Sequence, residues 1–230
     1  MVSALILSGG TGTRFGADIP KQYIKVNDKP IIYYCIRQLS EHEGIDTIQI
    51  VATEQWHDVI LECFGQIKST KFSGFSASGA TRQLSIYNGL KDIKKYAADT
   101  DYILIHDAAR PLLSAEMIAR SLNAIEGHDG VLPVLPMKDT IYESMDGKRI
   151  SALLDRDVLY AGQAPELFVL GKYYEANKKL LPDSIFKING STEPAVMAGM
   201  DIVMIPGETQ NFKITTKQDL ERFFEIIKQK

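Results

Sequence analysis

The residues best suited to chemistry lie together between Leu5 and Lys21, where an apolar run leads into a glycine-rich loop. The loop reads Ser-Gly-Gly-Thr-Gly-Thr-Arg-Phe-Gly; Arg14 lies inside it, and Lys21 follows Pro20. Glycines let a backbone approach a ligand closely, and successive backbone N–H groups in such a loop form a concavity that binds anions. Two cations on one short loop suit a polyphosphate. We therefore predict a phosphate site here.

Two better-known phosphate loops do not match this stretch. The dinucleotide fingerprint requires a third glycine where Phe15 stands, and a P-loop ends in Gly-Lys followed by Ser or Thr, which is missing here. An arginine and a lysine within the loop favour chemistry on the phosphate over simple binding. The alternative is an ordinary glycine-rich turn with solvated charges.

The composition bounds the class of protein. The chain has 230 residues, is 45% hydrophobic and 24% charged, and carries a net charge of -3, which fits one α/β domain over residues 1–230. The sequence has no basic run for nucleic acid and no apolar run near the roughly 20 residues of a membrane span. Cys35 and Cys63 fall at apolar helix positions and predict buried, reduced thiols. We expect a cytoplasmic protein without membrane or nucleic-acid partners.

Apolar runs typical of strands alternate with apolar stripes at helical spacing, which favours a mostly parallel sheet covered on both faces. Expected strands cover 2–7, 47–52, 71–75, 102–105, 130–136, 202–205 and 212–215. Expected helices begin near 30, 55, 81, 114, 172 and 216, and the stretch 160–166 is predicted to be a loop.

Three segments that follow strands are expected to meet, because ligands of such sheets bind beyond the carboxyl ends of the strands. They are the Gly9 loop, the segment around Gly79, and the run His106-Asp107-Ala108-Ala109-Arg110-Pro111. Asp107 is a hard oxygen donor suited to Mg²⁺ or to a substrate hydroxyl. Its alternative role is to cap the turn before Pro111.

The alternation stops over residues 137–156. Two short β-rich runs flank Met145-Asp146-Gly147-Lys148, and Asp-Gly is a hairpin signal. A lone hairpin is marginally stable in water. We therefore predict a β-arm that packs on a second copy of the chain.

Taken in order, these motifs resemble the cytidylyltransferases that activate methylerythritol phosphate or ribitol phosphate with CTP. The resemblance covers nearly the whole chain and rests on the glycine loop with Pro20-Lys21, on Gly79, Arg82 and Ser85, on the 106–111 run, and on Asp139-Thr140, Asp155-Arg156 and Phe212-Lys213-Ile214-Thr215. It implies a Rossmann-like three-layer α/β sandwich with a twisted sheet, a homodimer joined by the protruding β-arm, and Mg²⁺-dependent transfer of CMP.

The resemblance also implies roles for individual residues. Catalytic contacts to phosphate fall to Arg14, Lys21 and Lys213, although Lys213 without the resemblance reads as a solvated strand lysine. The residues implied to bind the nucleotide are Leu7, Ser8, Gly9, Gly10, Gly12, Thr13, Gly79, Ala80, Arg82, Ser85 and Ala108. By the same resemblance, the acceptor is bound by Asp107, Arg110, Thr140, Arg156 and Gln163. Thr140 and Arg156 reach into the site of the neighbouring subunit. Asp107 is also the expected metal ligand.

The chemistry agrees with this assignment. The acceptor phosphate attacks the α-phosphorus of CTP and expels pyrophosphate, so catalysis consists of positioning two anions and neutralising their charge. A phosphate dianion needs no general base at neutral pH. We accordingly read His106 as a structural residue, since no activated pair stands near it in sequence.

Two departures from the family pattern bear on the acceptor. The family usually reads Gln-Thr-Pro-Gln where this chain has Gln163-Ala164-Pro165-Glu166, which removes a hydroxyl, and residues 189–194 also differ. The glycine loop and Tyr160-x-Gly162-Gln163 favour a pentitol phosphate such as ribitol 5-phosphate. Methylerythritol phosphate, used in isoprenoid synthesis, is the alternative acceptor.

Two other functions remain open at this point. One is a nucleotide-binding module that has lost turnover, against which the pair Arg14 and Lys21 argues, because a pure binder needs no transition-state stabilisation. The other is a glycosyltransferase with an Asp-x-Asp metal motif. Asp99-Thr100-Asp101 has that spelling but precedes its strand, so it reads as a turn.

Overall fold

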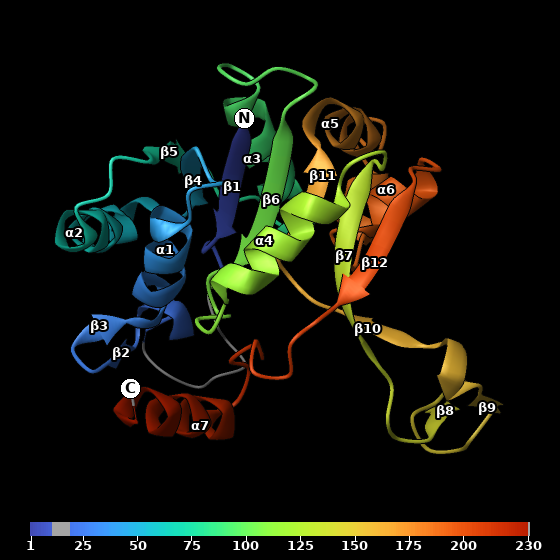
Figure 1. Cartoon of the computed structure of the whole chain (residues 1–230). Helices are drawn as coiled ribbons and strands as arrows, with labels where there is room; N and C mark the ends of the chain where they lie inside the picture. Colours follow the sequence, from blue (N-terminus) through green and yellow to red (C-terminus); the bar gives the residue numbers. More distant parts are fainter. Residues whose placement is uncertain (11–18, 230) are drawn as a thin grey trace.

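The computed structural model describes residues 1–10 and 19–229 and is shown in Figure 1. The predictions for Gly12, Thr13 and Arg14 lie outside the described residues. The strands are β1 (Val2–Leu7), β2 (Lys25–Val26), β3 (Lys29–Pro30), β4 (Thr47–Val51), β5 (Phe72–Ser76), β6 (Tyr102–Asp107), β7 (Gly130–Pro136), β8 (Ile141–Glu143), β9 (Ala152–Leu154), β10 (Tyr160–Gly162), β11 (Glu166–Val169) and β12 (Ile202–Pro206). The α-helices are α1 (Ile31–Glu41), α2 (His57–Ile67), α3 (Arg82–Ile93), α4 (Ala115–Ala124), α5 (Leu170–Lys178), α6 (Glu193–Met197) and α7 (Lys217–Lys228).

The main sheet has eight strands in the order β10-β7-β11-β6-β1-β4-β5, with β12 paired to β7. Strands β5, β4, β1 and β6 are mutually parallel, β12 is parallel to β7, and β10 and β11 run antiparallel to their neighbours. The prediction of a mostly parallel sheet is confirmed. The prediction of a loop over residues 160–166 is wrong, because β10 and the first residue of β11 both pair with longer strands there.

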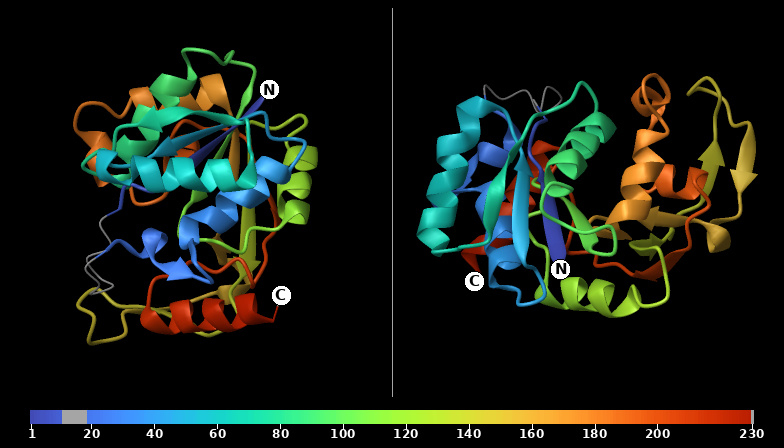
Figure 2. Two further views of the ribbon diagram at one scale, coloured as in Figure 1. Left: turned by 90° about the vertical axis from the view of Figure 1, so that its left-hand side faces the viewer. Right: turned by 90° about the horizontal axis from the view of Figure 1, so that it is seen from above.

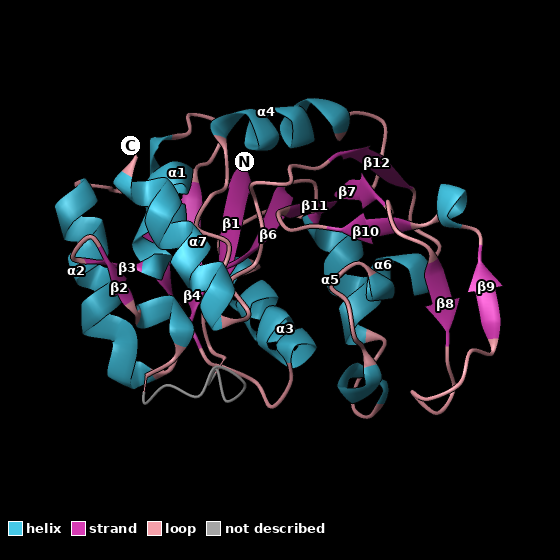
Figure 3. Cartoon of the chain, turned by 90° about the horizontal axis from the view of Figure 1, so that it is seen from below, coloured by secondary structure: helices cyan, strands magenta, loops and turns pink. Residues whose placement is uncertain are grey.

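Alternate residues of the central strands enter two separate cores, as expected for a sheet covered on both faces. Ala4 and Ile6 of β1 pack with α1, α2 and α4, whereas Leu5 packs with α3 and α5. Figure 3 shows the same division, with α4 on one side of the sheet and α3 and α5 on the other. The result is a three-layer α/β sandwich, as predicted.

The two cysteines lie in the first of these cores. Cys35 and Cys63 are buried and unbridged. Burial raises the pKa of the Cys63 thiol to about 12, so both read as apolar core residues.

The strand register brings the three predicted ligand segments to one level. Leu7 lies opposite Val51 on β4 and opposite Asp107 on β6, and Val51 in turn lies opposite Ser76 on β5. The segments that follow these strands therefore leave the same edge of the sheet. The predicted convergence at the carboxyl ends is confirmed.

The stretch predicted to form a β-arm is a separate two-stranded sheet, in which Ile141 pairs with Leu154 and Glu143 with Ala152. Its turn is fixed by the Asp146 carboxylate, which accepts hydrogen bonds from the backbone N–H groups of Lys148 and Arg149, both at 2.8 Å. Gly147 has a φ of +67°, which suits glycine. Figure 2 shows this hairpin at the margin of the molecule, apart from the main sheet.

The expected strand over residues 212–215 is wrong, because this segment has no regular structure and no strand beside it. A backbone hydrogen bond from Ile214 N to the carbonyl of Ala109, at 2.8 Å, ties it to the residues that follow β6. Among the described helices, none combines the length and the apolar character that a membrane span requires.

Helix α7 begins with a capping box, as predicted. The Thr216 hydroxyl accepts from Asp219 N, and the Asp219 carboxylate accepts from the backbone N–H and hydroxyl groups of both Thr215 and Thr216. Burial would raise the pKa of Asp219, but these hydrogen bonds outweigh burial and lower the pKa to about 2.

We expect Asp219→Ala to lower the free energy of unfolding by about 1–2 kcal/mol at pH 7, because four donors lose an ionised acceptor. A carboxyl with a depressed folded-state pKa contributes stability above its unfolded pKa of 3.8 and loses it as pH falls toward 2. Urea denaturation should therefore show the deficit shrinking below pH 4. Glu221→Ala, an exposed acid of the same helix, is the control and should change stability by less than about 0.5 kcal/mol.

Candidate active site

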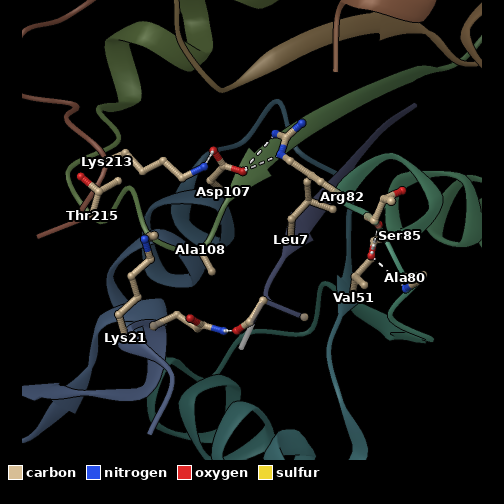
Figure 4. Close-up of a pocket in the computed structure, with 16 residues that line it drawn as sticks. Leu7, Lys21, Val51, Ala80, Arg82, Ser85, Asp107, Ala108, Lys213 and Thr215 are labelled. Carbon is tan, nitrogen blue, oxygen red and sulfur yellow. Dashed lines mark hydrogen bonds and ion pairs between the residues drawn. The ribbon is translucent and has the colours of Figure 1, made fainter. Parts of the chain in front are cut away.

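The carboxyl ends of β1, β4 and β6 open into a cavity of about 580 Å³. Its volume falls in the range of small-molecule sites. Figure 4 shows the lining side chains, which come from the glycine loop, the start of α3, the end of β6 and the segment before α7. The lining residues are Leu7, Gly9, Gly10, Lys21, Gln22, Val51, Gly79, Ala80, Thr81, Arg82, Ser85, Asp107, Ala108, Ala109, Lys213 and Thr215.

The centre of the cavity is a cluster of charges around Asp107, whose residue is only 8% exposed. Arg82 donates to Oδ1 from Nε and Nη2, at 3.2 and 3.0 Å, and Lys213 Nζ donates to Oδ2 at 2.9 Å (Figure 4). Burial alone would raise the pKa of Asp107, but Arg82 and Lys213 hold it far below its usual range. Asp107 is therefore an ionised clamp that joins α3 to the segment before α7.

The first part of the glycine loop is anchored by the residues that follow Pro20. The Gln22 amide donates to the carbonyls of Ser8 and Gly10, both at 2.8 Å, and the Ser8 hydroxyl donates to Tyr23 Oη at 2.7 Å. Tyr23 in turn stacks on Trp56 with ring centroids 4.1 Å apart. Because these contacts hold Gln22 and Tyr23 in place, the preceding residue, Lys21, lies on the cavity wall.

The Gly79 segment is shaped by the start of α3. The Thr81 hydroxyl caps the helix by accepting from Leu84 N at 3.2 Å, and Ser85 Oγ accepts from Gly79 N at 2.9 Å. A Cβ on Gly79 would lie 2.8 Å from the Leu84 carbonyl carbon, so only glycine fits at this close approach.

Side chains rather than a strand hold the segment that carries Lys213. The Arg110 Nη1 group donates to the Asn211 carbonyl at 2.7 Å, and Asn211 Nδ2 donates to the Ala164 carbonyl at 2.7 Å. The Gln163 amide makes two hydrogen bonds with the backbone of Glu208, at 3.0 and 2.9 Å. These contacts fix the direction in which Lys213 enters the cavity.

His106 lies under this framework with no exposed surface. Its Nε2 makes a 2.9 Å hydrogen bond with the Arg110 carbonyl, and burial lowers its pKa to about 4. A neutral imidazole that supports a backbone carbonyl away from the cavity wall is a structural group, in agreement with the sequence-based interpretation.

The cavity is lined by most of the predicted catalytic and nucleotide residues that the structure describes, and by Asp107, which was predicted as acceptor and metal ligand. Those that line it are Leu7, Gly9, Gly10, Lys21, Gly79, Ala80, Arg82, Ser85, Asp107, Ala108 and Lys213. Ser8 is buried behind the loop. Arg110 and Gln163 support the 208–214 segment, and Thr140 and Arg156 lie at the exposed base of the hairpin, so these four lie outside the lining of their own chain.

Sequence reasoning missed five lining residues, Gln22, Val51, Thr81, Ala109 and Thr215. Each is a sequence neighbour of a predicted residue or ends a predicted strand. Their closeness in sequence to predicted residues was the signal that could have identified them. Nothing local distinguishes their chemistry.

The described lining contains one carboxylate, Asp107, and no preformed group of three metal-ligating side chains was found among residues 1–10 and 19–229. Mg²⁺ commonly uses one or two carboxylates together with substrate phosphates and water. The donor set therefore fits a magnesium ion carried mainly by a nucleotide, with Asp107 as the carboxylate ligand that the described lining offers.

The fold and cavity define a class of protein: an α/β domain with a cationic site, large enough for a small molecule, beyond the carboxyl ends of its strands. A family model described as IspD, 2-C-methyl-D-erythritol 4-phosphate cytidylyltransferase, matches residues 2–229. The chain belongs to this family. It is accordingly a CTP-dependent cytidylyltransferase, a nucleotidyltransferase, and the resemblance inferred from the motifs is confirmed.

Individual relatives divide between two acceptors. The chain is 34% identical over 221 residues to a 2-C-methyl-D-erythritol 4-phosphate cytidylyltransferase of Clostridium botulinum, covering 96% of both. It is 29% identical over 225 residues to a ribitol-5-phosphate cytidylyltransferase of Vibrio parahaemolyticus, covering 97% of this chain and 94% of the relative. The crystal structure of a 4-diphosphocytidyl-2C-methyl-D-erythritol synthase superposes with a TM-score of 0.81 and 26% identity, over 98% of this chain and 97% of that one.

Proposed function

We propose that this enzyme transfers CMP from CTP to a pentitol phosphate such as ribitol 5-phosphate. The observation that carries the proposal is the cationic cavity around Asp107, with Lys21, Arg82 and Lys213 on its wall. The Gly-Gly-Thr-Gly-Thr-Arg sequence of the loop and the Tyr160-x-Gly162-Gln163 sequence favour a pentitol phosphate as the acceptor.

In the proposed reaction an oxygen of the acceptor phosphate forms a bond to the α-phosphorus of CTP. The bond from that phosphorus to the bridging oxygen breaks, and pyrophosphate leaves with the electron pair. Lys21 and Lys213 lie on the cavity wall, where they hold the two anions together and neutralise charge that develops on the phosphates. A phosphate dianion is already a nucleophile, so no side chain needs to remove a proton.

We also propose that Mg²⁺ accompanies CTP and that Asp107 is its protein ligand. When bound, the ion supplies positive charge at the phosphates and fixes their orientation. Arg82 would keep Asp107 ionised and oriented through Oδ1 after Lys213 has left Oδ2.

We further propose that two chains share each site. The hairpin exposes large apolar side chains, with Met145, Ile150 and Leu153 at 84%, 67% and 66% exposure, and the same patch on two copies can pack across a twofold axis. Thr140 and Arg156, at its base, would then bind the acceptor phosphate in the partner's cavity. A guanidinium binds phosphate in bidentate fashion.

Methylerythritol 4-phosphate is the second candidate acceptor. The observation in its favour is the higher identity to a relative named for that substrate, 34% against 29% for one named for ribitol 5-phosphate. The two acceptors differ in their carbon skeleton and hydroxyl pattern but present the same phosphate nucleophile.

Steady-state kinetics with CTP, Mg²⁺ and a panel of phosphates decides between them. The panel contains ribitol, arabinitol, methylerythritol, glycerol and ribose phosphates, and pyrophosphate release is measured. We expect a pentitol phosphate to have the highest kcat/KM. A preference for methylerythritol phosphate would contradict the acceptor proposal, and a preference for cyclic ribose phosphate would contradict both candidates.

A further inference from the structure

A continuous chain of buried polar groups runs behind the cavity from α3 to β11. The Gln83 amide donates to Tyr173 Oη at 3.2 Å and also to Asn177 Oδ1. The Tyr173 hydroxyl donates to the Ser191 carbonyl at 2.6 Å, and the Ser191 hydroxyl donates to Glu166 Oε2. All five residues are at most 9% exposed.

This chain starts and ends beside charged groups of the cavity. Gln83 directly follows Arg82, and Glu166 lies opposite Ile105 in the antiparallel pairing of β11 with β6. Asp107 is two residues beyond Ile105, so Asp107 and Glu166 project from the same face of the sheet, about 7–8 Å apart as diagonal neighbours. Arg82, from the helix that covers this face, pairs with Asp107, and its charge also interacts with that of Glu166.

The charge of Glu166 has no dedicated ion-pair partner among the described residues. Ser191 occupies Oε2, and within 1–10 and 19–229 no group donates a hydrogen bond to Oε1. The groups that act on its charge are Arg82 from α3, and Asp107 and Arg110 from the end of β6. Burial raises the pKa of Glu166 above its usual value, while Arg82 and the Ser191 hydroxyl oppose that shift.

We propose that Glu166 is a counter-charge for the cationic cavity: its carboxylate lies behind the wall and weakens phosphate binding enough for pyrophosphate to leave. Arg82, Arg110 and Lys213 bring three positive charges to or behind the wall, and Asp107, which pairs with all three, neutralises one of these charges. Glu166 neutralises a second from behind, where it does not block the space for phosphates.

The size of the effect follows from the distance. A unit charge within about 10 Å of bound phosphates, at the effective dielectric constant of a partly buried site, changes phosphate affinity by about tenfold. Product release limits kcat in many enzymes, so a group that weakens pyrophosphate binding can raise kcat while it raises Kd. This inference rests on the cytidylyltransferase activity and not on the choice of acceptor.

The test compares Glu166→Gln with wild type by isothermal titration calorimetry at pH 8, with CTP and with pyrophosphate as separate probes and no acceptor present. Glutamine has the same shape and can still accept from Ser191, so the buried network is retained. We expect Kd for both probes to fall about tenfold, because the anions lose a repulsive neighbour. Lost packing would weaken binding, so tightening is a result that a merely structural role does not produce.

Three variants isolate the charge. Glu166→Asp keeps the carboxylate and should bind CTP within about twofold of wild type. Ser191→Ala breaks the hydrogen-bonded chain while the carboxylate stays, and it should also lie within about twofold. Glu175→Gln makes the same change at an exposed position of α5 and serves as the matched control.

Unchanged or weaker CTP binding in a folded Glu166→Gln protein would overturn the proposal. So would tightening of equal size in Glu166→Asp, because the charge is retained there. Failure of wild type to bind CTP at all would contradict the cytidylyltransferase assignment, and this outcome is distinct from equal binding by the two proteins.

Discussion

Replacing Lys21 or Lys213 by alanine is expected to lower kcat for pyrophosphate release by about 100-fold or more. Each lysine places one preorganised positive charge on the cavity wall, and removing one such group typically costs two to three orders of magnitude. Because the charge acts mainly when phosphate oxygens gain charge in the transition state, KM for CTP should change much less than kcat. Steady-state kinetics with the preferred acceptor measures both.

The two variants differ in one informative respect. Lys213→Ala also removes a partner of Asp107, so Lys213→Arg, which retains the charge, should recover part of the activity. Lys25→Ala changes an exposed lysine of β2 outside the cavity and should retain wild-type kcat. Circular dichroism must show that each protein is folded. A folded Lys21→Ala enzyme with near-normal kcat would remove Lys21 from the catalytic assignment.

Mixing two inactive chains is expected to restore activity if the hairpin completes the neighbouring site. One chain carries Lys21→Ala and the other Arg156→Ala. In a mixed dimer, one cavity has its own Lys21 together with the partner's Arg156, so that site is intact. Random reassociation leaves about a quarter of all sites complete. Activity near that fraction of wild type, measured after unfolding and refolding the mixture, is the expected result.

The oligomeric state provides the control for this experiment. Each chain alone must remain below about one hundredth of wild-type activity, the loss expected for one missing phosphate contact. Excising residues 142–149 and closing the hairpin with a short turn should give a monomer that binds CTP without turnover. Light scattering that finds a fully active wild-type monomer would contradict the shared site. Lack of rescue in a verified mixed dimer would contradict it equally.

The fold could be predicted wherever apolar residues recur at the spacing of a helix or strand that buries one face. Ile32, Cys35, Ile36 and Leu39 recur at helical spacing, and all four are fully buried in α1. The capping box at Thr216 is local, so its geometry could be predicted from two residues. Such features depend on neighbours along the chain.

The antiparallel strands of the main sheet, β10 and β11, could not be predicted in this way. Residues 160–162 form β10 only because β7 extends far enough to pair with them, and all three of these residues are exposed. No alternation of buried and exposed side chains marks so short an edge strand. For residues 212–215 the opposite error occurred, because a strand was predicted where none forms. The apolar residues of this segment are buried by loops and by α7 without a pairing strand.

The site likewise contains residues that could be placed from local sequence and contacts that could not. Asp107 could be placed because a carboxylate that ends a buried strand must lie at the ligand edge of a parallel sheet. Its hydrogen-bonded partners Arg82 and Lys213 lie 25 and 106 residues away in sequence, and no local pattern encodes such pairings. The supporting contacts of Gln163 and Arg110 are equally long-range, at 45 and 101 residues.

The long separation in sequence between Asp107 and Lys213 also means that the two residues are synthesised at different times. A ribosome adds about 5–20 residues per second, so roughly 5–20 seconds pass between the synthesis of these two residues. During that interval Arg82, made earlier, is the partner that can neutralise Asp107 as β6 packs between β1 and β11. The cation balance of the cavity is thus completed late in translation, because Lys213 is added after every strand of the main sheet has been synthesised.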